Sequence, residues 1–339
     1  MLESIRVAQV GGRAAAEFAG RVFADLGAGV TAFYPPEHRS PPYLERGKEI
    51  VRAPSLEELG NNLTAAIDGF DLAVVGMTRT DRKRLNLDFE HRPDSRLRVA
   101  LVTPFGESGP YADWQGTDLE CQALGGASLS VGKNDRPPLP YPGNQSGTQA
   151  GLVAVTALLA ALQRDVSSTE VIEVSESDVW ATFHTGTGIV NWIFHNRKRQ
   201  RAGHRVADGL YPHQLFRCAD GWVAVDCAEG RQWRRFLEVV GHPEWSKEPN
   251  FKDRRALDAD RTDALLSDWF QARTRDEVFA ACRAAAIPAA PVLSLEEAVS
   301  LEQLAARQFL IADAGRVYPG LPFRESAPVA ASPRPGVQV

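Results

Sequence analysis

The chain has 339 residues, a formal net charge of −5 and an isoelectric point of about 5.9. Hydrophobic residues make up 44% and charged residues 24% of it, which is typical of globular proteins and excludes wholesale disorder. The acidic balance gives no indication of a nucleic-acid partner.

Three further features bear on where the chain acts. The longest strongly apolar stretch, residues 150–162, is too short to span a bilayer, so no membrane partner is expected. The four cysteines lie far apart without a C-x-x-C pair, which favours a reducing compartment, and no metal site is expected. The N-terminal residues lack a secretory pattern. The sequence therefore predicts a cytoplasmic protein.

The first hundred residues alternate between strand and helix patterns. Apolar segments predict strands at 5–10, 29–34, 71–76 and 97–103, and periodic segments predict helices at 13–27 and 55–69. Strands separated by helices are typical of βαβ units with a parallel sheet. The sequence thus predicts an α/β fold.

The second half continues this pattern and then changes near residue 213. We predict a buried helix at about 148–164, a strand at 170–175 and a long apolar helix at 177–195. The helix ends in a basic run at 196–201, which we interpret as a solvated helix end, with an anion or nucleic-acid patch as the alternative. A hairpin turning at Asp220-Gly221, helices at 231–241, 256–272 and 275–286, and a strand–helix pattern at 287–299 follow. We predict a large domain formed by 1–205 with 296–339, and a small domain at 213–295.

Several segments resemble family III CoA-transferases, the CaiB/BaiF family, in the same order along the chain. They are RVAQVGGRAAAEFAGRVFADLGAGV (6–30), ERGK (45–48), TPFGESGPYADWQGTDLECQALGG (103–126), GRQWRRFLEVVG (230–241) and RTRDEVFAACRAAAIPAAPVLSLEEA (273–298). The resemblance implies a Rossmann-like large domain, a smaller inserted α+β domain and two chains interlocked like links. It also implies acyl-CoA and a carboxylic acid as substrates, with no tightly bound cofactor.

The residue that matters most to that family is an Asp nucleophile, which attacks the acyl-CoA thioester and then carries CoA. The matching segment is NQSGTQAGLVAVTALLAAL (144–162), in which Gly147 stands at the Asp position. Residues 136–164 contain no Asp or Glu, so a shifted alignment supplies none. Ser146 has a hydroxyl but no histidine near it in the sequence, and we interpret it as the N-cap of the buried helix.

The resemblance also implies binding residues. Asp118 matches an acidic residue beside the family's nucleophile, and a structural loop carboxylate is the alternative. CoA contacts are implied at Ala14, Lys48, Met77, Arg84 and, in the remnant of a Gly-rich flap at 227–232, Gly230. Lys and Arg are suited to phosphate groups, although solvated surface positions are the alternative for Lys48 and Arg84.

These observations favour the Asp-less subunit of a CoA-transferase, as a homodimer or as a heterodimer with an Asp-bearing homologue. The alternatives are a stand-alone acyl-CoA lyase, hydratase or isomerase that uses Asp118 or Glu120, and a non-enzymatic acyl-CoA-binding protein. Family racemases use a His in a G-H-D motif, which here reads Gly116-Thr117-Asp118, so racemisation is not expected. A dinucleotide-binding oxidoreductase is disfavoured, because residues 10–20 lack G-x-G-x-x-G.

Overall fold

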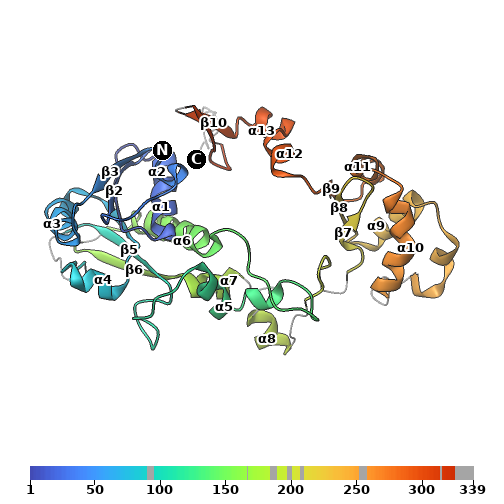
Figure 1. The fold of residues 1–339 in the computed structure, drawn as a ribbon, viewed down its shortest axis with the longest axis horizontal. Coiled ribbons are helices and arrows are strands. Elements are labelled where there is room, and N and C mark those ends of the chain that lie inside the picture. Colours follow the sequence, from blue (N-terminus) through green and yellow to red (C-terminus); the bar gives the residue numbers. More distant parts are fainter. Residues whose placement is uncertain are drawn as a thin grey trace, which may run out of the picture. The chain divides into compact units, whose positions relative to one another are not determined.

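A computed structural model describes residues 1–89, 95–165, 167–183, 189–196, 201–206, 210–251, 258–313 and 315–324. The chain divides into two compact units (Figure 1). Unit 1 comprises residues 1–113, 147–174 and 299–339, and unit 2 comprises residues 114–146 and 175–298. The predicted domain boundaries at 213 and 295 stay a prediction.

Unit 1 is built on a six-stranded sheet with the strand order β3-β2-β1-β4-β5-β6. The strands are β1 (Arg6–Val10), β2 (Gly29–Tyr34), β3 (Lys48–Arg52), β4 (Leu72–Val75), β5 (Arg98–Thr103) and β6 (Glu170–Ser175). In register, Val7 of β1 lies between Val30 of β2 and Leu72 of β4, and both pairings are parallel. This is the strand order of Rossmann folds, whose ligands bind at the carboxyl edge where the order reverses, between β1 and β4. The predicted α/β class with a parallel sheet is confirmed.

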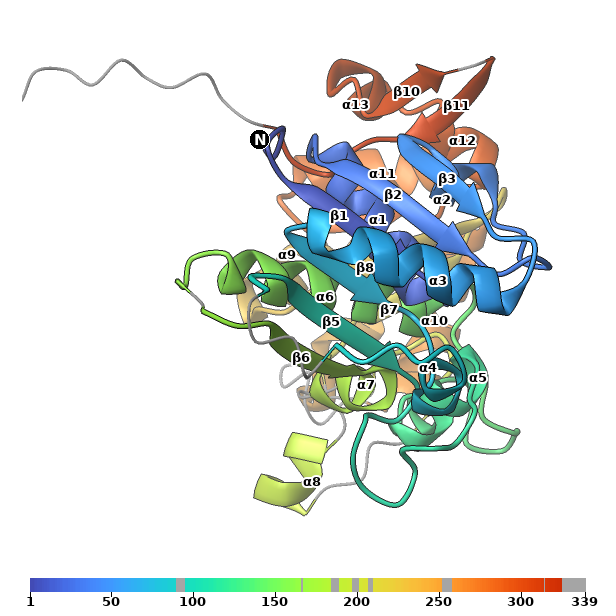
Figure 2. The same ribbon diagram turned by 90° about the vertical axis from the view of Figure 1, so that its left-hand side faces the viewer.

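Helices cover both faces of this sheet (Figure 2). They are α1 (Ala14–Asp25), α2 (Pro42–Glu45), α3 (Leu56–Ala66), α4 (Arg79–Arg84) and α6 (Gln145–Ala161), with a 3-10 turn at Ile67–Gly69. Side chains alternate along a strand. Ala8 and Val10 therefore pack with Leu59 and Leu63 of α3, whereas Gln9 faces α1. A hairpin of β10 (Leu310–Asp313) and β11 (Arg316–Pro319) also belongs to unit 1. Helix α13 (Glu302–Ala306) lies beside this hairpin instead of on the sheet (Figure 2).

Helix α6 crosses α1 at Gly151. A Cβ at this position would lie 2.7 Å from the carbonyl oxygen of Ala15 and 3.3 Å from the amide nitrogen of Ala19. Only a residue without a side chain allows this approach, because the neighbouring atoms belong to the backbone. The two helices therefore lie side by side on one face of the sheet. Both begin at its carboxyl edge, since crossover helices run antiparallel to the strands that they join.

Unit 2 contains a second, three-stranded antiparallel sheet of order β7-β8-β9. Its strands are β7 (His213–Arg217), β8 (Trp222–Asp226) and β9 (Ala289–Pro291), and its helices are α5 (Asp118–Leu124), α7 (Glu176–Phe183), α8 (Ile189–His195), α9 (Gly230–Val239), α10 (Ala259–Gln271) and α11 (Arg275–Ala284), with α12 (Leu295–Val299) at its end. Short 3-10 turns lie at Ser128–Ser130, Glu244–Lys247 and Pro249–Phe251. The predicted hairpin with its turn at 220–221 is confirmed.

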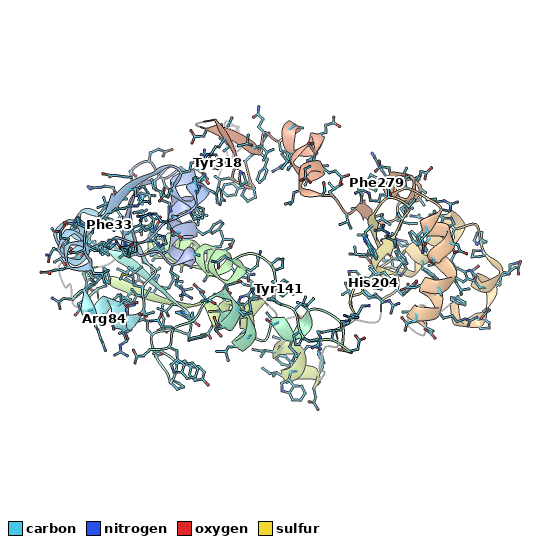
Figure 3. All side chains as sticks on the ribbon, viewed as in Figure 1. Phe33, Arg84, Tyr141, His204, Phe279 and Tyr318 are labelled. Carbon is cyan, nitrogen blue, oxygen red and sulfur yellow. The ribbon has the colours of Figure 1, made fainter. Side chains whose placement is uncertain are left out.

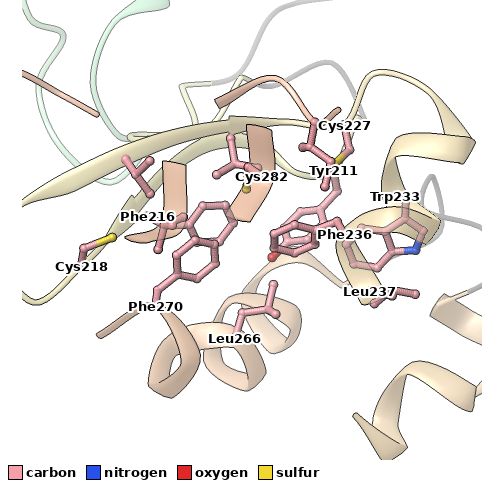
Figure 4. Packing of buried hydrophobic residues seen from close by; sticks show 14 of the residues in the cluster. Tyr211, Phe216, Cys218, Cys227, Trp233, Phe236, Leu237, Leu266, Phe270 and Cys282 are labelled. Carbon is pink, nitrogen blue, oxygen red and sulfur yellow. The ribbon is translucent and has the colours of Figure 1, made fainter. Parts of the chain in front are cut away.

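An aromatic core holds the small sheet to its helices (Figure 4). Phe216 of β7 stacks on Phe270 of α10 with a ring separation of 4.1 Å. Trp233 of α9 is 2% exposed, and its indole N–H donates to the carbonyl oxygen of Phe251 at 2.8 Å. These contacts bury α9 and α10 against one face of the sheet.

The structure differs from the sequence predictions at several elements. The helix predicted at 177–195 is described as α7 and α8, and residues 184–188 between them lie outside the described residues. Most of the basic run at 196–201 also lies outside them. Strand β3, α4, α5 and the β10–β11 hairpin were not predicted. Within the described ranges, no helix is long and apolar enough to cross a membrane.

Replacing Gly151 by Ala tests the contact between α1 and α6. Alanine in an ordinary helix interior is more favourable than glycine by about 1 kcal/mol. Here the added methyl group meets backbone atoms, and overpacking typically costs about 1–3 kcal/mol. We therefore expect Gly151→Ala to lower the free energy of unfolding, as measured by denaturant titration.

The matched control is Gly230→Ala at the start of α9, where a Cβ would have no atom within 4 Å. The free energy of unfolding of this variant should equal or exceed that of the wild type. A wild-type or higher stability for Gly151→Ala would contradict the close approach.

Candidate functional site

Lys48 lies at the start of β3, with its ammonium between β1 and α1. Nζ donates to Gln9 Oε1 at 2.5 Å and to the carbonyl oxygen of Glu17 at 2.7 Å. Gln9 is fully buried and Lys48 is half-buried. Gly20 of α1 makes room for this pair, because a Cβ there would lie 2.6 Å from Gln9 Oε1. These contacts disfavour the alternative for Lys48, a solvated surface position.

The surroundings of Lys48 disfavour the charged form of its amine. Burial lowers the pKa of the amine from its ordinary value to about 7, partly opposed by the negative charge of Glu17. The two acceptors do not compensate fully, since Gln9 is neutral and Glu17 offers its backbone oxygen. An anion placed beside Lys48 would favour the charged form. The amine is therefore suited to gain a proton when an anionic ligand binds.

Met77 and Ala14 lie at the carboxyl edge of the sheet, where β1 and β4 end. Met77 is 9% exposed and packs in the core on the α3 side. Gly11 adopts a φ of +82°, and a Cβ there would lie 2.6 Å from Met77 Cγ. Because this side chain is buried, a contact between CoA and Met77 would involve the backbone of Met77. Ala14 is the first residue of α1, and Gly147 is the third residue of α6.

Arg84 ends α4 with its side chain 73% exposed, 3.8 Å from a carboxylate oxygen of Asp81 (Figure 3). The buried arginine of this helix is Arg82, which pairs with Glu107 through both guanidinium nitrogens and donates to the carbonyl oxygen of Met77 at 2.9 Å. Arg82 therefore holds the loop after β4 to the loop after β5. The exposed Arg84 guanidinium can reach a ligand only from the surface.

Asp118 holds the first turn of α6. Its Oδ1 accepts a hydrogen bond from the backbone N–H of Ser146 at 2.7 Å, and its Oδ2 accepts one from the Gln122 side-chain amide at 2.6 Å. A carboxylate at this place satisfies an N–H that has no partner within the helix, and it interacts favourably with the helix dipole. This geometry supports the structural alternative for Asp118.

The interpretation of Ser146 as the N-cap of α6 is wrong, because the helix begins at Gln145 and Ser146 lies inside its first turn. Its hydroxyl is fully buried, accepts from the indole N–H of Trp180 at 2.6 Å and donates to the carbonyl oxygen of Asp118 at 3.2 Å. Tyr141, which Figure 3 labels, stacks on Trp180 with a ring separation of 5.3 Å. The sequence offers no signal for this, since Trp180 lies 34 residues further along.

Glu120 and Gly230 have clear local roles. The Glu120 carboxylate accepts from the backbone N–H of Thr117 at 2.8 Å, which completes a capping box at the start of α5. Hydrogen bonds from Thr117 lower the pKa of Glu120. Gly230 is exposed at the start of α9. The structure thus brings Ala14 and Gly147 to one edge in unit 1, and Asp118 and Ser146 into one network in unit 2.

Gln9 and Arg82 were missed from the sequence. Gln9 is a polar residue inside the apolar strand RVAQV, an irregularity that could have marked it. Arg82 lies in the segment RTDRKR, where it begins a run of three consecutive basic residues. Nothing in that segment distinguishes the buried arginine from the exposed one.

Known proteins resemble this chain in sequence and in fold. A sequence model described as CoA-transferase family III matches residues 61–336. Succinate–glutarate CoA-transferase of Agrobacterium fabrum is 25% identical over 352 residues, which cover 94% of this chain and 88% of that protein. The beta subunit of succinyl-CoA–L-malate CoA-transferase of Chloroflexus aurantiacus is 27% identical over 67% of this chain and 58% of that subunit. The crystal structure of a CAIB/BAIF family protein from Brucella suis has the same fold, with a TM-score of 0.84 at 22% identity, covering 96% of this chain and 92% of that chain.

The lowered pKa of Lys48 gives a test of the implied phosphate contact. If a phosphate of CoA lies beside Lys48, binding at about pH 8 should raise the pKa of the amine and take up as much as about one proton. Calorimetric titration in buffers of different ionisation enthalpy measures that uptake. Lys48→Met, which keeps the apolar stem, should lose it. Equal uptake by both proteins would show that the phosphates bind elsewhere.

Proposed function

Because the chain belongs to CoA-transferase family III, we propose that it is the Asp-less subunit of a CoA-transferase that moves CoA between carboxylic acids. The observation that carries this proposal is the residue at the nucleophile position, Gly147, which has no side chain to form an acyl anhydride. Residues 136–164 contain no Asp or Glu that could replace it.

The neighbouring polar groups support this proposal, because each is already engaged. Both carboxylate oxygens of Asp118 accept hydrogen bonds. Glu120 caps its own helix. The Ser146 hydroxyl is buried and donates its proton to a backbone carbonyl rather than to a base. A stand-alone lyase, hydratase or isomerase that depends on Asp118 or Glu120 is therefore not favoured.

CoA itself enters as a substrate rather than as a resident cofactor. In this proposal, Lys48 contacts a phosphate, Arg84 contacts the adenosine end from the surface, and Ala14 and the Met77 backbone contact the ligand at the carboxyl edge. Gly230, in unit 2, would act in a site completed by a second chain. None of these residues identifies the acyl group or the acceptor acid.

Assembly with a second chain has two supports. The Chloroflexus relative is itself named as a subunit. In unit 2, α8 exposes Trp192, Ile193 and Phe194 at 49%, 66% and 74%. Apolar groups gathered on one short helix are typical of an interface. We propose a dimer, either of two copies or with an Asp-bearing homologue.

Mixing the chain with an Asp-bearing family III homologue tests the proposal. We expect the two proteins to copurify, and CoA transfer from succinyl-CoA to a carboxylic acid to rise in the mixture above either protein alone. The isolated chain should transfer no CoA. Efficient transfer by the isolated chain would contradict the Asp-less subunit.

Gly147→Asp tests the missing nucleophile directly. After incubation with succinyl-CoA, intact mass should show an adduct on this variant that hydroxylamine removes, and none on the wild type. Transfer should remain weak, because an ångström of misplacement can cost on the order of a hundredfold in rate. A hydroxylamine-sensitive adduct on the wild type would contradict the account, and efficient transfer by the variant would show that Gly147 is the only lesion.

A further inference from the structure

A cavity lies on one face of the three-stranded sheet in unit 2 and has a volume of about 410 Å³. Side chains alternate along each strand, so Phe216 and Val225 enter the aromatic core on the other face. His213 at the start of β7 and Asp226 at the end of β8 line the cavity. Its apolar walls are formed by Val206, Leu215, Ala224, Pro288 and Ala290. Cavities of about 300–1,000 Å³ are typical of sites for small organic molecules.

His213 and Asp226 lie directly opposite each other, because their strands pair antiparallel in this register. Residues paired in this way have their Cβ atoms about 4.5–5.5 Å apart. His213 Nδ1 and Asp226 Oδ1 are both buried and have no hydrogen-bond partner among the described residues. Across the part of the chain that the structure describes, no residue bonds to either side chain. Folded proteins rarely leave two neighbouring polar side chains in this state, because it costs free energy.

The other polar side chains of the cavity are already engaged. The Gln214 amide donates to Asp263 Oδ1 at 2.5 Å, and His204 Nε2 lies 3.4 Å from Asp263 Oδ2. Asp263 in turn accepts from Arg205 Nε at 3.0 Å, so its charge is compensated. No Lys or Arg is found among the described residues that line the cavity. The charge of the Asp226 carboxylate is therefore left without a counter-charge in the cavity.

The two side chains without partners require hydrogen-bond donors. An ionised carboxylate only accepts hydrogen bonds, and a neutral imidazole accepts one at its unprotonated nitrogen. A primary ammonium group offers three N–H donors and a charge opposite to that of Asp226. A carboxylate ligand would be repelled by Asp226, and a quaternary ammonium has no N–H to donate. The apolar walls are suited to a hydrocarbon body attached to the ammonium group.

We propose that this cavity binds a primary organic amine. The ammonium group donates to a carboxylate oxygen of Asp226 and to a ring nitrogen of His213, and the hydrocarbon body packs against Leu215 and Ala224. The site lies entirely within unit 2. It goes beyond the proposed function and does not depend on the binding of CoA in unit 1.

Calorimetric titration of the full chain with benzylamine tests the proposal, because this probe joins a primary ammonium to an apolar ring. We expect one benzylamine to bind per chain. Benzyltrimethylammonium has the same ring and charge without an N–H, and phenylacetate has the opposite charge. Both should bind at least about tenfold more weakly than benzylamine, because neither can donate to Asp226.

Two variants test the residues that hold the amine. Asp226→Asn keeps the size of the side chain without its charge, and should weaken benzylamine binding by about tenfold or more. His213→Leu removes one acceptor and should weaken it less. Asp268→Asn removes an exposed carboxylate from α10 in the same unit, and is the matched control that should bind as the wild type.

Thermal unfolding gives a second readout. Benzylamine should raise the unfolding temperature of the wild type but not that of Asp226→Asn. Without benzylamine, Asp226→Asn should unfold at the same temperature as the wild type or higher, because it removes a charge that has no partner.

Four results would overturn the inference. They are no binding of benzylamine, equal binding of benzyltrimethylammonium, an unchanged affinity in Asp226→Asn, or a lower unfolding temperature of that variant without benzylamine. If Asp226→Asn does not fold, His213→Leu decides, and a wild-type affinity in it refutes the site. Titration with CoA in the same buffer keeps the two proposals apart, since the amine site stands or fails whether or not CoA binds.

Discussion

The contact between α6 and α1 at Gly151 is the constraint on which the rest of unit 1 depends. It allows two backbones to meet where a single methyl group would lie 2.7 Å from a carbonyl oxygen. Because both helices start at the carboxyl edge of a sheet with Rossmann strand order, their first turns come together there. Ala14 and Gly147 are consequently brought to one edge, where such folds bind ligands.

The same edge shows how the chain departs from the chemistry of its family. Gly147 removes the carboxylate, and the polar groups that follow in sequence serve structure instead. Asp118 satisfies the first turn of α6, and Ser146 ties that turn to Trp180. Buried polar groups of this kind are costly to leave without partners, which explains why each has one. A covalent route through them would break the contacts that hold the helix.

Much of the fold could be predicted because its signals are local. Strands β1, β2, β4 and β5 are short apolar runs bounded by turns, and the long α6 is apolar throughout. Strand β3 could not be predicted, because KEIVR mixes charges with apolar residues at a sheet edge and its place is set by pairing with β2. The candidate site was also harder to predict than the fold, because contacts between distant parts of the sequence determine it. The burial of Lys48 and the hydroxyl contacts of Ser146 both depend on residues distant in sequence.

Amide hydrogen exchange of the isolated chain, with and without CoA, tests the central claim most directly. The claim is that the carboxyl edge of the unit 1 sheet binds CoA although Gly147 offers no nucleophile. Slower exchange on adding CoA is predicted for the turn after β1, the first turn of α1 and residues 145–151. Unchanged exchange in all three segments, or protection confined to the α9 and α10 region of unit 2, would contradict it.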